Sequence, residues 1–255
     1  MCGIIGIVGK QPVTERLMDS LKRLEYRGYD SAGVATIVGG KIERRRAQGK
    51  IRALEDRLLN EPLSGTIGIG HTRWATHGAP SERNAHPHTS GRVTLVHNGI
   101  IENFAELKGE LTGQGHSFES DTDTEVIAHL IDRQLGRGDS PVTALKTTLD
   151  MITGAFALAV LIEGQDNVIM GARRGSPLVV GYGDGEMFLG SDALAVGPFT
   201  SKIAYLDEGD FVAIDHAIAR IFCSASFSRS RIAGSCDSTK ASALALSSRL
   251  RISSS

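Results

Sequence analysis

Cysteine and tryptophan are scarce in this 255-residue sequence, an excess of either charge is missing, and long apolar runs are absent. Three cysteines, an odd number with no Cys-x-x-Cys pair, provide neither a disulfide framework nor a paired metal motif. The net charge of −1 lacks the basic excess that a general nucleic-acid binder needs. No run approaches the roughly 20 apolar residues that span a bilayer. The first six residues also lack the features of a signal peptide, so we expect a cytoplasmic protein without nucleic-acid or membrane partners.

The composition changes after residue 222. Residues 223–255 hold 12 serines in 33 positions, with five basic residues against one acidic residue. Such a polar, weakly periodic segment cannot bury enough apolar surface to fold alone, and we predict that it is largely disordered. We therefore divide the chain into a folded domain, 1–222, and a Ser-rich tail, 223–255, to which we assign no function.

The folded domain is predicted to be rich in short strands. Apolar residues at helical spacing predict helices over 13–25, 50–59, 103–113, 123–135 and 141–152. Apolar runs between turn signals predict strands at 2–9, 32–38, 41–47, 66–73, 92–97, 155–162, 167–172, 177–182, 186–190, 202–206, 210–214 and 217–222. Two blocks of strands with helices between them favour stacked sheets covered by helices, an α+β fold, over a doubly wound parallel sheet.

Cys2 is the first residue with evident chemistry. A small second residue generally allows Met1 to be removed, which would leave Cys2 with a thiol and a free α-amine. A thiolate is a nucleophile, and an α-amine with a pKa near ~7.7–8.0 can accept a proton at neutral pH. One residue could then supply both nucleophile and base. The alternative is a small buried hydrophobe at the start of a strand.

Three polar clusters follow predicted strands or precede a helix. Arg73 offers a planar fork suited to a carboxylate, although a lone loop arginine is often only solvated. Asn98-Gly99 is a turn signal, but it can also present a side-chain amide and a backbone N–H to one oxyanion. Asp123 can cap the following helix or face a ligand ammonium group.

Two further patterns indicate metal or phosphate sites only weakly. Five of the eight histidines lie between positions 71 and 97, but no His-Glu-x-x-His motif accompanies them, and we expect no metal site. The glycine-rich run at 181–185 lies between two predicted strands with no helix after it, which favours a hairpin turn.

Taken together, these clusters form a set of motifs. They occur in the order Cys2-Gly3-Ile4-Ile5-Gly6, Tyr26-Arg27-Gly28-Tyr29-Asp30-Ser31-Ala32-Gly33, His71-Thr72-Arg73-Trp74-Ala75-Thr76-His77-Gly78, His97-Asn98-Gly99-Ile100-Ile101-Glu102-Asn103 and Thr122-Asp123-Thr124-Glu125. This set resembles the glutaminase domain of the glutamine–fructose-6-phosphate aminotransferases (glucosamine-6-phosphate synthases), which are class II, N-terminal-nucleophile amidotransferases. The resemblance covers about 1–222. The second and third motifs favour this family over the related phosphoribosylpyrophosphate amidotransferases and asparagine synthetases.

The resemblance implies a four-layer αββα sandwich and a role for each matched residue. Cys2 would attack the side-chain amide of L-glutamine, and Asn98 with the Gly99 N–H would stabilise the oxyanion. Arg73 would bind the substrate carboxylate and Asp123 its ammonium group. The remaining residues implied by the resemblance are Trp74, Thr76 and His77, in a loop closing over glutamine, and Arg27, near Cys2. No cofactor or metal is implied.

The resemblance also implies an isomerase domain that receives the ammonia. We expect that domain to be absent here, because the chain passes into the Ser-rich tail, and we expect this fragment to be a monomer limited to hydrolysis of glutamine. Two alternatives stay open at this point. The chain could serve another amidotransferase, or it could be a truncated product that binds glutamine without turnover.

Overall fold

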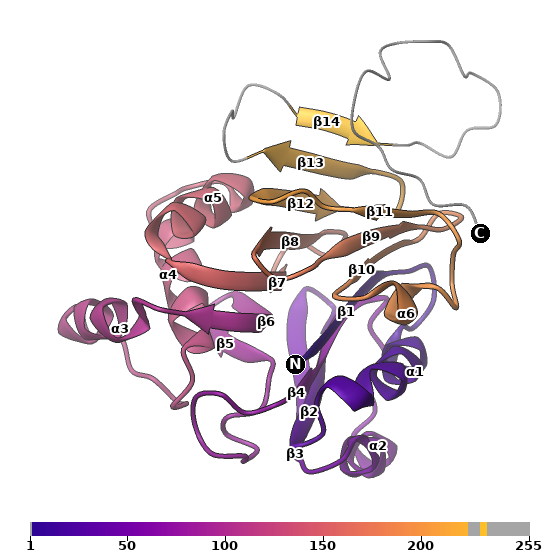
Figure 1. Ribbon diagram of the computed structural model, residues 1–255, viewed down its shortest axis with the longest axis horizontal. Helices are drawn as coiled ribbons and strands as arrows, with labels where there is room; N and C mark the ends of the chain where they lie inside the picture. Colours follow the sequence, from indigo (N-terminus) through magenta and orange to yellow (C-terminus); the bar gives the residue numbers. More distant parts are fainter. Residues whose placement is uncertain (1, 224–229, 234–255) are drawn as a thin grey trace.

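Two seven-stranded antiparallel sheets form the centre of the computed structural model, which describes residues 2–223 and 230–233 (Figure 1). The first sheet has the order β11-β9-β10-β1-β4-β2-β3, with bounds Ile203–Tyr205, Val179–Tyr182, Met187–Gly190, Gly3–Val8, Ile67–Arg73, Ser31–Val38 and Lys41–Gln48. The second has the order β14-β13-β12-β8-β7-β6-β5, with bounds Ser230–Ala233, Ala219–Cys223, Asp210–Ile214, Ile169–Arg174, Gly154–Ile162, Val93–Ile101 and His88–Ser90.

Helices cover the outer face of each sheet (Figure 1). The first sheet is covered by α1, α2 and α6, with bounds Thr14–Leu24, Ile51–Asn60 and Ala193–Val196. The second is covered by α3, α4 and α5, with bounds Phe104–Gly113, Thr124–Gly136 and Pro141–Met151. A short 3-10 turn, Glu25–Arg27, follows α1. The expected αββα sandwich is therefore confirmed.

The stacking creates three apolar layers, one between the two sheets and one between each sheet and its helices. Strand β1 contributes to two of them. Successive side chains of a strand point to opposite faces. Ile4 and Val8 accordingly pack into the layer between the two sheets, while Ile5 and Ile7 pack against the helices of the first sheet. Burial of each such side chain contributes about 1.5–3 kcal/mol. A strand buried on both faces needs a continuous apolar sequence, which is what residues 3–8 provide.

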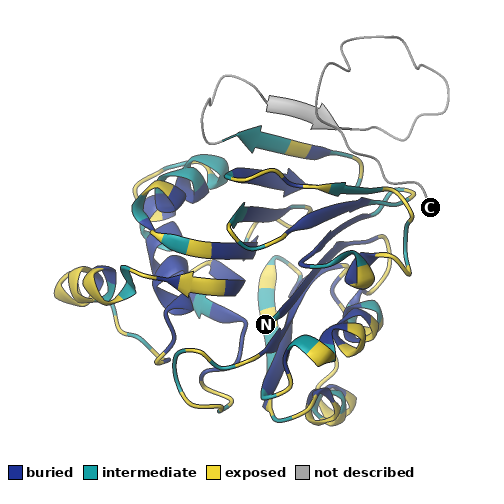
Figure 2. Cartoon of the chain, viewed as in Figure 1, coloured by how far each residue is buried: buried dark blue, intermediate teal, exposed yellow. Residues whose placement is uncertain are grey.

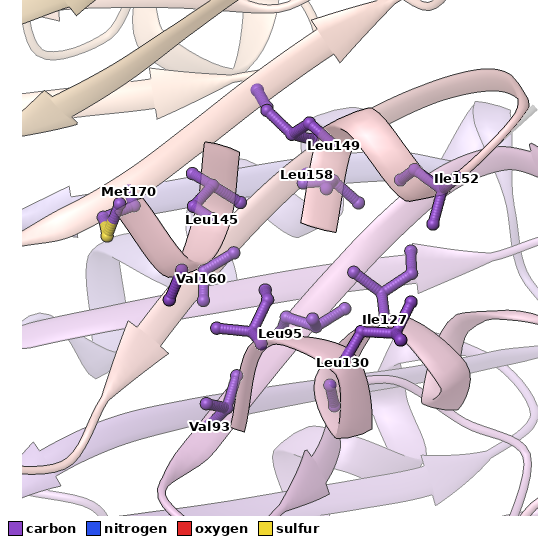
Figure 3. Packing of buried hydrophobic residues seen from close by; sticks show 14 of the residues in the cluster. Val93, Leu95, Ile127, Leu130, Leu145, Leu149, Ile152, Leu158, Val160 and Met170 are labelled. Carbon is purple, nitrogen blue, oxygen red and sulfur yellow. The ribbon is translucent and has the colours of Figure 1, made fainter. Parts of the chain in front are cut away.

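The third layer lies between the second sheet and its helices. Figure 3 shows Leu95, Leu158 and Val160 from the strands meeting Ile127 and Leu145 from α4 and α5. Figure 2 shows the same arrangement at the level of the whole chain, with buried residues on the sheets and exposed residues on the outer helix faces. No helix in residues 2–223 and 230–233 is long and apolar enough to cross a membrane.

The strand at 92–97 differs from the prediction in a way that bears on the site. It continues as β6 to Ile101, so Asn98 and Gly99 pair with Ala157 and Phe156 of β7 instead of forming a turn. Gly99 has φ +128°, and a Cβ there would lie 1.9 Å from the carbonyl oxygen of Ala155. Gly99 thus allows a distorted strand backbone to pass close to the backbone of Ala155. The alternative that Asn98-Gly99 forms only a turn is wrong.

The other predicted elements are found, with small shifts at their ends. The run at 181–185 is confirmed as a hairpin turn between β9 and β10, closed by the hydrogen bond from the Gly183 N–H to the Glu186 carbonyl oxygen. Within the Ser-rich tail, β14 pairs with β13. This strand was not predicted, because its pairing depends on the edge that β13 offers rather than on an apolar pattern of its own. The rest of the tail, 224–229 and 234–255, lies outside the described residues, and its disorder stays a prediction.

Candidate active site

Four segments from different elements meet at one end of the layer between the sheets. Because β1 and β4 are antiparallel with Gly3 opposite Thr72, the start of the chain lies beside Arg73 at the end of β4. The end of β6 brings Asn98 to the same place from the second sheet, and the side-chain amide of Asn98 donates to the Cys2 carbonyl oxygen at 3.0 Å. Asp123 approaches from the residue before α4, where its Oδ2 accepts a hydrogen bond from the Ile101 N–H at 2.8 Å.

A cavity of about 290 Å³ lies at this junction. This volume is near the lower end of the range of small-molecule sites, which fits a small ligand. All nine predicted site residues line it: Cys2, Arg27, Arg73, Trp74, Thr76, His77, Asn98, Gly99 and Asp123. The lining also includes residues for which no role is predicted: His86, His97, Ile100, Thr122, Thr124, Ser176 and Pro177.

The Cys2 thiol is held by the backbone of Trp74. Its Sγ accepts a hydrogen bond from the Trp74 N–H at 3.2 Å and lies 3.5 Å from the Trp74 carbonyl oxygen. Burial raises the pKa of the Cys2 thiol, against the opposing effects of the Trp74 N–H and the Arg73 charge. The protonated thiol is therefore favoured at neutral pH, and any nucleophilic reaction of Cys2 needs a base to take the proton.

Arg73 combines a structural contact with an unused donor. Its Nη2 donates to the carbonyl oxygens of His77 and Gly78, the latter at 2.9 Å, and so fixes the loop that follows β4. Its Nη1 is buried, has no hydrogen-bond partner among the described residues, and lies 3.8 Å from the nearer carboxylate oxygen of Asp30. Burial lowers the pKa of Arg73, and Asp30 acts against that shift. A buried cationic N–H without a hydrogen bond is costly, so this nitrogen suits an anionic ligand.

The loop of Trp74, Thr76 and His77 is anchored at two further points. Asp30 accepts a hydrogen bond from the Ala75 N–H, and Tyr29 packs edge-on against Trp74 with ring centroids 5.3 Å apart. Trp74 itself remains 48 % exposed. Asp30 has no predicted role, although it lies within the second motif. Its position in that motif is the one feature of the sequence that could have indicated a role. Its contact with the Ala75 N–H depends on the fold.

Arg27 and Asp123 are two further predicted site residues that line the cavity. Arg27 Nη1 donates to the Ser191 carbonyl oxygen at 3.2 Å and lies 3.4 Å from Asp192, so the loop before α6 holds its side chain in the lining of the cavity. Asp123 is the N-cap residue of α4 but makes no side-chain capping hydrogen bond. Its carboxylate instead accepts a hydrogen bond from the Ile101 N–H and lines the cavity. The alternative that Asp123 only caps the helix is therefore wrong.

Four buried histidines lie beside the cavity and are neutral at physiological pH. Burial lowers the pKa of His71 and His88 to about 3 and also lowers the pKa of His86 and His97. His86 stacks on His71, and the other ring contacts are made within the same group, with threonine hydroxyls or with the side chain of Asn98. Across the part of the chain that the structure describes, no three His, Cys, Asp or Glu side chains are arranged to hold a metal ion.

These histidines predict a loss of stability in mild acid. In the unfolded chain their pKa values are about 6.5, so below that pH the unfolded state binds more protons than the folded state. For His71 and His88, the free energy of unfolding should fall by on the order of 1 kcal/mol per histidine for each pH unit well below 6.5. Thermal melts should give an unchanged melting temperature between about pH 7 and 8 and a steep fall from about pH 6.5 to 5.

A matched variant makes this test specific. His88→Phe removes one of the buried titrating groups, so its melting temperature should fall less steeply with pH than that of the wild type. An equal melting temperature for the wild type at pH 7 and pH 5 would contradict the burial of neutral histidines.

Several known proteins are similar to this chain in sequence. A family model described as a glutamine amidotransferase domain matches residues 71–197. A glutamine–fructose-6-phosphate aminotransferase (isomerizing) from Caulobacter vibrioides is 74 % identical over 222 residues, which are 87 % of this chain and 37 % of that protein. The chain belongs to the class II glutamine amidotransferases. The relative of the same name from Brucella suis is 61 % identical over 84 % of this chain and 35 % of its own length.

Solved amidotransferase structures share the fold. The glutamine phosphoribosylpyrophosphate amidotransferase from B. subtilis superposes with a TM-score of 0.77 at 27 % identity, covering 90 % of this chain and 54 % of that chain. A glutamine aminotransferase class-II domain protein from Silicibacter pomeroyi, 18 % identical, superposes with a TM-score of 0.59 over 88 % of this chain and all of that chain, and shows the fold alone. The chain thus has the αββα sandwich of the N-terminal-nucleophile amidotransferases and spans little more than a third of its aminotransferase relatives.

Proposed function

We propose that this amidotransferase domain hydrolyses the side-chain amide of L-glutamine to glutamate and ammonia, with Cys2 as the nucleophile. The observation that carries the proposal is that one small cavity is lined by a thiol, a guanidinium group with an unused donor, a carboxylate and a side-chain amide. Glutamine presents one carboxylate, one ammonium group and one amide. Arg73, Asp123 and Cys2 with Asn98 match these three groups in turn.

The first half of the proposed reaction forms a thioester. With Met1 removed, the α-amine of Cys2 takes the thiol proton, and Sγ bonds to the amide carbon of glutamine. The Asn98 side-chain N–H and the Gly99 N–H stabilise the negative oxygen of the tetrahedral intermediate. When the intermediate collapses, the carbon–nitrogen bond breaks, and the leaving nitrogen takes the proton back from the α-ammonium group and departs as ammonia. A γ-glutamyl thioester remains on Cys2.

The second half reverses the proton path. The same α-amine removes a proton from water, the hydroxide bonds to the thioester carbon, and the carbon–sulfur bond breaks. Glutamate leaves, and the proton returns to sulfur. Trp74, Thr76 and His77 close over the substrate in this proposal, and Arg27 orders the Cys2 end of the site.

We further propose that the ammonia is destined for fructose 6-phosphate, as the names of the relatives indicate, and that an isomerase domain is the partner that receives it. The support is 74 % identity to a glutamine–fructose-6-phosphate aminotransferase over 222 residues. That this chain is monomeric stays a prediction.

The test is a glutamate-release assay on the purified protein. Glutamate and ammonia should appear in equal amounts from L-glutamine. A protein whose Met1 has been removed, which binds glutamine but releases no glutamate, would overturn the proposal in favour of a glutamine-binding role.

Arg73→Lys should raise the KM for glutamine about 10- to 100-fold and change kcat little, because a charge-assisted hydrogen bond is lost from ground and transition states alike. In Arg73, Nη2 donates to the loop carbonyls while Nη1 is left for the substrate carboxylate. The single ammonium group of a lysine cannot make both interactions. Steady-state kinetics measure the effect. Arg92→Lys, a change of the same kind at an exposed position outside the cavity, should keep the wild-type KM. An unchanged KM in Arg73→Lys would remove Arg73 from the substrate site.

A further inference from the structure

The side-chain amide of Asn98 is held at both ends. Its nitrogen donates to the Cys2 carbonyl oxygen at 3.0 Å, and its oxygen lies 3.0 Å from Nε2 of His71. Asn98 is 8 % exposed, so few water molecules can replace either contact. Both contacts run from β6 of the second sheet to the first sheet or its start, because His71 lies on β4 and Cys2 immediately precedes β1.

The hydrogen on His71 can be assigned from its partners. Nε2 lies 3.0 Å from the Asn98 amide oxygen and 3.0 Å from the His97 carbonyl oxygen. Both atoms only accept hydrogen bonds, so Nε2 carries the hydrogen and donates to both. Burial lowers the pKa of His71 to about 3, so the ring stays neutral and keeps this single donor through the physiological range.

The ring of His71 has little freedom to move. It is fully buried and stacks on His86, with ring centroids 4.1 Å apart and planes inclined by 11°. Its backbone pairs with Ile4 and Gly33 on the two neighbouring strands of the sheet. The donor therefore has a fixed position relative to β6.

We propose that His71 is a positioning residue for glutamine hydrolysis, whose Nε2–H holds the Asn98 amide with its nitrogen toward Cys2, where the oxyanion forms. This inference rests on the proposed function. Without that donor, the amide can rotate by half a turn and present its oxygen, which repels the developing negative charge. Because the requirement arises only in the transition state, loss of His71 should reduce kcat and leave KM nearly unchanged.

A double-mutant cycle tests the proposal. His71→Phe keeps a ring that can stack on His86 and removes the donor, and its kcat should fall about 10- to 100-fold with KM within about 2-fold of wild type. Asn98→Ala should lower kcat by about 10²–10³. If His71 acts through Asn98, His71→Phe should lower the rate less than about 2-fold further in the Asn98→Ala background. Effects that multiply in the double variant would overturn the proposal.

Two more variants separate positioning from stability. His71→Gln places an amide N–H near the position of Nε2 and should recover most of kcat. His88→Phe makes the same change at an equally buried histidine whose Nε2 contacts Thr122 at 3.2 Å, and it should keep kcat within about 2-fold of wild type. If thermal melts show that His71→Phe does not fold, His71→Met replaces it as the variant without a donor.

The outcomes distinguish this proposal from the function on which it rests. A wild-type protein that releases no glutamate overturns both. An active wild type in which His71→Gln is as slow as the variant without a donor, or in which His88→Phe is as slow as His71→Phe, overturns only the role of His71.

Discussion

Cys2→Ala should reduce glutamate release to the background of the assay, because among the residues that the structure describes no other side chain lining the cavity is a thiol. The proposed reaction passes through a bond between Sγ and the glutamine carbon, so removal of the sulfur removes the pathway rather than slowing it. The variant should still bind glutamine, since Arg73 and Asp123 are unchanged. Steady-state glutamate release measures the first effect and calorimetric titration with glutamine the second.

A second cysteine provides the control. Cys223 is also a free cysteine, and it lies at the end of β13, outside the cavity. Cys223→Ala should keep wild-type activity. Substantial turnover by Cys2→Ala, or a comparable loss in Cys223→Ala, would contradict the assignment of the nucleophile.

One extra residue before Cys2 should lower kcat by about 10²–10⁴, the contribution of a general base. Proteolytic removal of a fused tag can leave either Cys2 or a single glycine as the first residue. Both proteins keep the thiol, but in the second the nitrogen of Cys2 is an amide and cannot take the proton. Because burial raises the pKa of the Cys2 thiol, the loss of that base is not offset by spontaneous ionisation.

A measurement of glutamine binding distinguishes loss of the base from steric blocking of the cavity by the added residue. Trp74 is the only tryptophan in the chain and lines the cavity, so its fluorescence should change on addition of glutamine in both proteins. Equal turnover by the two proteins would show that the α-amine is not the base. Loss of the fluorescence change in the extended protein would show that the added residue excludes the substrate, which would also contradict the proposed role of the amine.

The sequence predicts most of the fold because local patterns and tertiary packing agree. Residues 3–8 are continuously apolar and become a strand buried on both faces, and the heptad-like leucines of 14–24 become a helix with one buried face. The pattern fails where pairing depends on a neighbour. The short strand β5 is defined by its ladder to β6, and its three residues carry no periodicity.

The site could be predicted only in part for the same reason. The order of the motifs indicates that Cys2, Arg73 and Asn98 belong to one site. Asn-Gly, however, is a common turn dipeptide. Its position inside β6 follows from the pairing of β6 with β7. The contacts of Asp30 with the 74–78 loop and of His71 with Asn98 join segments far apart in the chain. No local pattern contains them, and they become visible only when the two sheets are stacked.

The most direct measurement is the position of a covalent label from 6-diazo-5-oxo-norleucine, a diazo ketone analogue of glutamine. Mass spectrometry of peptides from the treated protein should find one adduct per chain, on Cys2 at a free amino terminus, and an excess of glutamine should slow its formation. A label on Cys223 or Cys236, or no label on a protein that binds glutamine, would contradict a glutaminase in which Cys2 attacks the substrate.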